Sequence, residues 1–87
     1  MKHDEIRDEI GVHNPDAIVY DPKELDHAII GISGDGCVVY SYKKLMGIFM
    51  TINKDWTEKD AEEWISYNVV GSHLGKYNPV VVYDLYY

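Results

Sequence analysis

The sequence has little cysteine, no long apolar run and few positive charges. Its single cysteine, Cys37, excludes an internal disulfide framework and a cysteine-rich zinc site, so we expect a reducing, cytoplasmic setting. No apolar run approaches the roughly 20 residues that cross a bilayer, and the charged residues 1–10 lack the apolar stretch of a signal peptide. The sequence therefore predicts no association with a membrane.

Positive charge is scarce, because 8 lysines and arginines stand against 15 aspartates and glutamates, a formal net charge of −7. A protein binds the nucleic-acid backbone through a positive surface that releases counterions, so direct nucleic-acid binding is disfavoured. A charged partner should instead be basic, such as a positive groove on a protein, or a metal ion. The same negative charge also keeps a small domain in solution without any partner, and the composition fits both interpretations.

The length of 87 residues allows one domain, with no room for a large enzyme core or an enclosed cofactor cavity. We expect residues 17–87 to form that domain and to bind no cofactor. A polar, carboxylate-rich segment, residues 1–16, precedes it. Within this segment Asp4 to Ile10 can form a short helix that Gly11 closes, and Asn14-Pro15 then favours an extended or turn conformation.

A β-hairpin is the strongest local signal. Two runs rich in β-branched residues, 28–33 and 37–42, flank Gly34-Asp35-Gly36, and Asp-Gly favours the positive φ that a tight turn needs. The two strands are therefore predicted to be antiparallel. Residues 17–20 form a further short apolar run, which either adds an edge strand as a fourth strand or stays outside the sheet.

Two helices and a last strand follow the hairpin. Ser41 is a good N-cap for a helix that runs to about Ile52 with apolar residues at helical spacing. Thr57 is a good N-cap for a second helix that ends at Gly71, and the run 79–85 is a third strong strand. The order ββααβ predicts an α+β fold, in which a small antiparallel-rich sheet of three or four strands carries both helices on one face.

The stretches AIIGISGDGCVVYSYKKLMGIFM, DWTEKDAEEWISYNVVG and NPVVVYDL resemble a family of small, uncharacterised proteins encoded in bacteriophage and prophage genomes. The matching residues include Ala28-Ile29-Ile30-Gly31, Val38-Val39-Tyr40, Glu63-Trp64-Ile65 and Pro79-Val80-Val81-Val82, and the resemblance covers about residues 25–85. It carries over no catalytic residue. It implies a phage-borne accessory protein in the host bacterial cytoplasm, where small acidic phage proteins such as anti-CRISPR inhibitors bind host machinery.

The serine motifs identify no catalytic site. In Gly31-Ile32-Ser33-Gly34 the second glycine falls one residue too early for a nucleophile elbow, and the strand turns into another strand. Ser41 and Lys44 have the S-x-x-K spacing, but the companion motifs are absent and an N-cap explains the serine. Asp35 lacks the further oxygen ligands of a calcium loop and the lysine of a P-loop. We therefore expect no enzyme.

The histidines His3, His13, His27 and His73 are scattered along the chain. A zinc site could only assemble in space, from His27, His73 and nearby carboxylates, and no spacing requires one, so we expect no metal. A ligand-binding or catalytic site would otherwise require that the Gly34 turn, His27 and His73 converge on a pocket. A small-ligand binder or minimal enzyme built in this way is the third function considered.

Carboxylates gather around the predicted second helix. Residues at this spacing can share a helix face that imitates the phosphate array of a nucleic acid and fits a basic groove, although an ordinary solvated face has the same pattern. Tyrosines near or on the last strand add packing area while keeping a polar tip. The candidate partner-binding residues are therefore Asp55, Glu58, Glu62, Glu63, Tyr77 and Tyr83.

The leading hypothesis is a phage accessory protein that binds and inhibits a host protein with a basic surface. In its sharpest form it is an anti-CRISPR or other anti-defence inhibitor whose acidic surface mimics nucleic acid. The second hypothesis is a homo-oligomeric structural or virion-assembly protein. There the tyrosine-rich last strand pairs with a second copy, which gives a homodimer by extension of the sheet.

Overall fold

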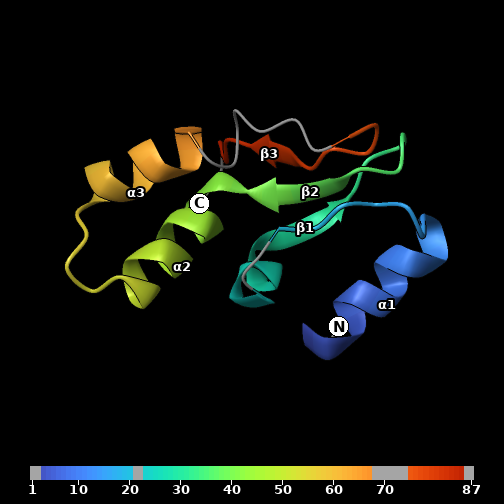
Figure 1. The fold of residues 1–87 in the computed structure, drawn as a ribbon, viewed down its shortest axis with the longest axis horizontal. Coiled ribbons are helices and arrows are strands. Elements are labelled where there is room, and N and C mark those ends of the chain that lie inside the picture. Colours follow the sequence, from blue (N-terminus) through green and yellow to red (C-terminus); the bar gives the residue numbers. More distant parts are fainter. Residues whose placement is uncertain (1–2, 21–22, 68–74, 86–87) are drawn as a thin grey trace.

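The computed structural model describes residues 3–20, 23–67 and 75–85 of the chain. These residues form an α+β fold, as the sequence predicts, around a three-stranded sheet with the strand order β1-β2-β3. Figure 1 shows the sheet in the middle of the molecule, with α1 at one end and α2 and α3 at the other. The elements are α1 (His3–His13), the 3-10 helix η1 (Lys23–Ala28), β1 (Ile29–Ile32), β2 (Val38–Ser41), α2 (Tyr42–Ile52), α3 (Glu58–Ile65) and β3 (Val80–Val82).

The predicted antiparallel hairpin is confirmed, with strands shorter than the apolar runs. β1 pairs with β2, and the turn is closed by two backbone hydrogen bonds between Ser33 and the residues that follow it. The Ser33 N–H donates to the Cys37 carbonyl at 2.8 Å, and the Gly36 N–H donates to the Ser33 carbonyl at 3.0 Å. Gly36 has a φ of +89°, and a Cβ there would lie 2.8 Å from Asn14 Nδ2, so this position requires glycine.

The expectation of an antiparallel-rich sheet is only half right, because β3 pairs with β2 in parallel. The register places Val39 beside Val80 and Ser41 beside Val82. A parallel neighbour needs a long crossover connection, and α2 and α3 lie within that connection. The last strand therefore enters the sheet in the same direction as β2, and the carboxyl ends of both strands meet at the same edge.

The edge strand considered for residues 17–20 is not formed. The Tyr20 N–H donates to the Tyr40 hydroxyl at 2.9 Å, and the two rings pack with their centroids 5.0 Å apart. The Tyr40 hydroxyl thus accepts the hydrogen bond that the Tyr20 N–H would otherwise donate to a neighbouring strand. Among the described residues the sheet has three strands, and no fourth strand joins it.

Both predicted N-caps are confirmed. The Ser41 hydroxyl accepts a hydrogen bond from the Lys44 N–H at 3.2 Å at the start of α2. Thr57 and Asp60 form a reciprocal capping box at the start of α3, in which the Thr57 N–H donates to Asp60 Oδ2 at 2.9 Å. The predicted helix end at Gly71 lies outside the described residues, as do His73 and the final tyrosines at 86 and 87.

The N-terminal helix is longer than the sequence suggests and contributes to the core. α1 continues past Gly11 to His13, and the Asn14 N–H donates to the Ile10 carbonyl at 2.8 Å. Ile10 is buried with side chains from η1, β2, α2 and α3, so one core joins both ends of the molecule. The buried hydrophobic residues are Ile10, Tyr20, Leu25, Ala28, Val38, Tyr40, Leu45, Phe49, Ala61 and Ile65.

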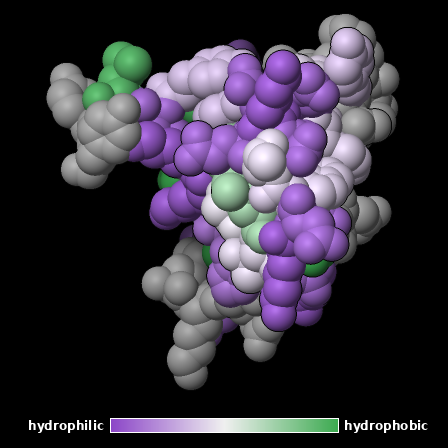
Figure 2. Space-filling model, turned by 90° about the vertical axis from the view of Figure 1, so that its left-hand side faces the viewer, coloured by the Kyte–Doolittle hydropathy of each residue, from purple (hydrophilic) through white to green (hydrophobic). Residues whose placement is uncertain are grey.

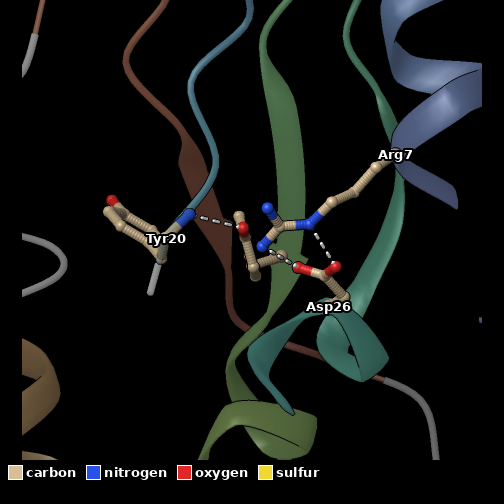
Figure 3. Close-up of polar contacts among 4 residues, drawn as sticks. Arg7, Tyr20 and Asp26 are labelled. Atoms are coloured by element: carbon tan, nitrogen blue, oxygen red, sulfur yellow. Dashed lines mark hydrogen bonds and ion pairs between the residues drawn. The ribbon is translucent and has the colours of Figure 1, made fainter. Parts of the chain in front are cut away.

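A buried ion pair fastens α1 to η1 (Figure 3). Asp26 is completely buried, and Arg7 approaches it with Nε 2.6 Å from Oδ2 and Nη2 3.1 Å from Oδ1. A buried carboxylate is costly without a cation and hydrogen bonds, and the two-pronged guanidinium supplies both. Arg7 itself stays 38% exposed, so its charge keeps contact with solvent.

Removing one partner of this pair should destabilise the fold. We expect Arg7→Leu to lower the free energy of unfolding by about 3 kcal/mol, because the buried Asp26 carboxylate loses the guanidinium that compensates its charge. The double variant Arg7→Leu/Asp26→Leu should recover most of that loss, since it buries no charge. Urea unfolding measures both, with the exposed Asp8→Asn as control. A single variant as stable as the control would contradict the role of the pair.

The buried hydroxyl of Tyr40 should make the fold sensitive to alkali. Burial, reinforced by the charge of Asp26, raises the pKa of Tyr40 to about 12, although the hydrogen bond from Tyr20 acts in the opposite direction. A phenol whose pKa is higher in the folded chain stabilises the fold below pH 10 and loses that contribution as the pH rises through 12.

We therefore expect the wild-type chain to lose roughly 3 kcal/mol of stability between these two pH values through Tyr40. Tyr40→Phe should be less stable at neutral pH, by about 1 kcal/mol, but should decline less steeply in alkali. Urea unfolding across this range measures the difference, with the exposed Tyr67→Phe as control. Parallel alkaline curves for wild type and Tyr40→Phe would refute the prediction.

Candidate partner-binding surface

Four of the six candidate residues are exposed carboxylates on one segment of the chain, and we call them the acidic surface: Asp55, Glu58, Glu62 and Glu63. Asp55 lies in the loop before α3, and the three glutamates lie on α3 itself, while Ala61 and Ile65 of the same helix are buried. None of the four carboxylates forms an ion pair with another described residue. Figure 2 views the molecule from this end and shows hydrophilic residues over much of its coloured surface.

The acidic surface continues onto a pair of tyrosines. The rings of Tyr42, at the start of α2, and Tyr83, just after β3, pack with their centroids 4.7 Å apart. Burial, then the charge of Glu62 and then Tyr83, raise the pKa of Tyr42, so the glutamate lies close to this pair. Tyr83 remains 60% exposed. The fold therefore brings Glu62 and Tyr83, two predicted residues, together around Tyr42, which the sequence reasoning missed.

Asp84 holds Tyr83 in this place. The Ser41 hydroxyl donates to Asp84 Oδ2 at 2.7 Å, and the Lys43 N–H donates to Asp84 Oδ1 at 3.2 Å. Since Ser41 also accepts from Lys44, the chain after β3 and the first turn of α2 share one network. The Ser41 hydrogen bond, supported by the Lys43 N–H, lowers the pKa of Asp84. Its carboxylate also suits the positive end of the helix dipole.

Tyr77 is not part of this surface. It precedes β3, whereas Tyr83 follows it, so the two tyrosines lie at opposite ends of the strand. Tyr77 is half-buried, and the Lys76 Nζ lies 5.3 Å from the centroid of its ring. The structure therefore separates the two tyrosines that the sequence reasoning treated together.

Of the residues considered for a small-ligand site, His27 and the Gly34 turn do not converge, and His73 lies outside the described residues. His27 lies in η1 before β1, while Ser33 and the Gly34 turn follow β1, so the strand separates them. The Ser33 hydroxyl is engaged in the turn, because it accepts from the Cys37 N–H at 3.1 Å. His27 instead borders a hollow of about 500 Å³ between η1 and α2. No group of three metal-ligating side chains occurs within residues 3–20, 23–67 and 75–85.

A second hollow, of about 480 Å³, lies between α1 and the edge strand β1, and isoleucines dominate its walls. A third, of about 410 Å³, follows α3 beside the acidic surface. None of the helices in the described part of the chain has the length and apolar character needed to span a bilayer. In comparisons with family models, curated proteins and solved structures, nothing matches this chain.

The Asp84 network predicts an acid-sensitive contribution to stability. Because the pKa of Asp84 is lowered in the fold, its stabilisation is present above its unfolded pKa near 4 and is lost as the pH falls through the folded pKa. We expect Asp84→Asn to be less stable than wild type at neutral pH and to converge with it at low pH. Urea unfolding across the acid range measures this. The exposed Asp55→Asn serves as control, and a constant gap at all pH values would refute the prediction.

Proposed function

We propose that this chain is a phage-borne accessory protein that binds a host protein with a basic surface and inhibits it. Support comes from the meeting of charge and aromatic area at Tyr42, since the charge of the exposed Glu62 acts on Tyr42 and the exposed ring of Tyr83 packs against it. Interfaces combine aromatic anchors with charges that steer the partner. The most specific version of this proposal is an anti-defence or anti-CRISPR inhibitor. In that version the host protein binds nucleic acid in a basic groove, and the acidic surface of this chain occupies the groove.

The observation that carries the proposal is that the acidic surface forms no ion pair within the described part of the chain. Carboxylates that stabilise a fold are paired or hydrogen-bonded, as Asp26 and Asp84 are. The four carboxylates of the acidic surface have no ion pair among the described residues, so their charge is available to a partner. Lys54 and Lys59 on the same segment offset part of this negative charge, but neither lysine forms an ion pair with the four carboxylates.

Capture from a bacterial lysate at low and high salt tests the proposal. The tagged wild-type chain should retain a nucleic-acid-binding host protein at low salt, release most of it at high salt and reduce its activity. Reversal of Glu58, Glu62 and Glu63 to lysine should weaken that binding about tenfold, since each exposed charge contributes about 0.5 kcal/mol.

The matched control reverses Glu5, Asp8 and Glu9, which are equally exposed on α1 at the other end of the molecule. It makes the same change in net charge and should bind like the wild type. Circular dichroism and urea unfolding check that both triple variants fold. Equal weakening by the two variants would show that only net charge matters, and undiminished binding by the α3 variant would defeat the nucleic-acid mimicry.

A homo-oligomeric structural role is the second candidate, and the exposed apolar side chains of the last strand favour it. Val80 and Val82 of β3 and Leu85 beyond it are exposed, and among the described residues β3 is an edge strand. Such an edge can pair with a second copy. Sedimentation velocity distinguishes the roles, because Val80→Lys should dissociate a dimer formed through β3 and leave capture of a host protein unchanged.

A further inference from the structure

The hollow beside α3 has an unusual lining. Its walls are Trp56 in the loop before α3, three residues of α3 that share one helix face, and Tyr67 just after α3; the three are Asp60, Glu63 and Trp64. Three aromatic rings and two carboxylates therefore meet in about 410 Å³. This lining adjoins the acidic surface and includes one of its members, Glu63.

The core holds the two tryptophans in place. Phe49 of α2 packs against Trp64 with the ring centroids 4.6 Å apart, and against Trp56 with a centroid distance of 6.3 Å. Both tryptophans are only half-buried, so each has part of its surface against Phe49 and part in the hollow. Tyr67, at the other end of the hollow, is 82% exposed. Phe49 thus fixes the two indole rings of the hollow, and Tyr67 contributes an exposed ring.

The two carboxylates differ in their roles. Asp60 is oriented by the capping box, where its Oδ2 accepts from the Thr57 N–H at 2.9 Å. Glu63 is exposed and forms no ion pair with a described residue. The hollow therefore offers one fixed and one adjustable negative charge beside aromatic faces.

We infer that this hollow binds an arginine side chain of the protein partner. The inference rests on the proposed function in taking the ligand from a protein, and it specifies the chemistry that the basic surface must present. Aromatic faces attract cations, and the carboxylates of Asp60 and Glu63 add charge complementarity. A neutral or anionic side chain gains neither the attraction to the aromatic faces nor the attraction to the two carboxylates.

Arginine fits this lining better than lysine. Its planar guanidinium stacks on an indole ring while its N–H groups donate to a carboxylate, and it is more weakly hydrated than an ammonium group. In an open hollow the lysine ammonium keeps most of its water and gives up less of it for the rings. The geometry thus selects an arginine among basic side chains.

Tryptophan fluorescence tests the inference directly, because both tryptophans of the chain line the hollow. The probes are three capped Gly-Ser peptides that differ only in their central residue, which is arginine, lysine or citrulline. Citrulline has nearly the shape of arginine without its charge. We expect a saturable fluorescence change with the arginine peptide, binding about fivefold weaker with the lysine peptide and no saturation with the citrulline peptide.

Two single substitutions locate the binding. Glu63→Gln removes a charge of the lining and should weaken the arginine peptide about tenfold. Glu62→Gln removes the same charge from the same helix outside the hollow and should leave that affinity within about twofold. Both positions are exposed, so the fold is retained.

Equal effects of the two substitutions would overturn the inference, because the fluorescence change would then report a general attraction to negative charge. Equal binding of the arginine and citrulline peptides would also overturn it, because the positive charge would then contribute nothing to binding. Salt-sensitive capture of a host protein would in that case still support the proposed function. Conversely, arginine binding with the expected variants but no captured host protein would leave the site standing and refute the proposed function. The two failures are therefore distinguishable.

Discussion

The parallel pairing of β3 with β2 is the constraint on which the rest of this molecule depends. It aligns the carboxyl ends of the two strands, and β2 runs directly into α2 at that edge. The chain leaving β3 therefore reaches the first turn of α2, where Asp84 binds Ser41 and the Lys43 N–H. The same pairing sets Tyr83 against Tyr42 and close to Glu62 of α3. With an antiparallel last strand, Asp84 and Tyr83 would lie at the opposite edge of the sheet.

The features that the sequence predicts correctly are those decided within a few residues. Ser41 and Thr57 begin their helices because each cap closes on an N–H three positions ahead, and the Gly34 turn closes within residues 33–37. The direction of β3 depends on the path of the whole crossover, which no local pattern contains. Residues 17–20 have the composition of a strand, but the partner of the Tyr20 N–H is the distant Tyr40 hydroxyl. The Arg7–Asp26 pair was missed for the same reason, although a carboxylate between Leu25 and Ala28 was a usable signal.

The part of the candidate site that lies on α3 was predictable from the sequence, whereas the contribution of the tyrosines was not. Helical periodicity correctly separates the exposed Glu58, Glu62 and Glu63 from the buried Ala61 and Ile65, because that pattern is local. The tyrosines needed the strand register, and so Tyr77 and Tyr83 could not be told apart. The aromatic lining beside α3 depends on how the loop before the helix folds back, because Trp56 of that loop and Trp64 of α3 both pack against Phe49.

The long connection before β3 also sets the order in which the molecule is completed. β1 and β2 need only the turn 33–37 to meet, whereas β3 must return across residues 42–79. Closing the longer connection costs more entropy, so we expect the hairpin and α2 to form first and β3 to dock last. Until then Ser41 caps α2 alone and Tyr42 lacks its neighbour. The acidic end of the molecule therefore reaches its full shape only when the last residues are in place, and an incompletely folded chain presents charge without the aromatic anchor.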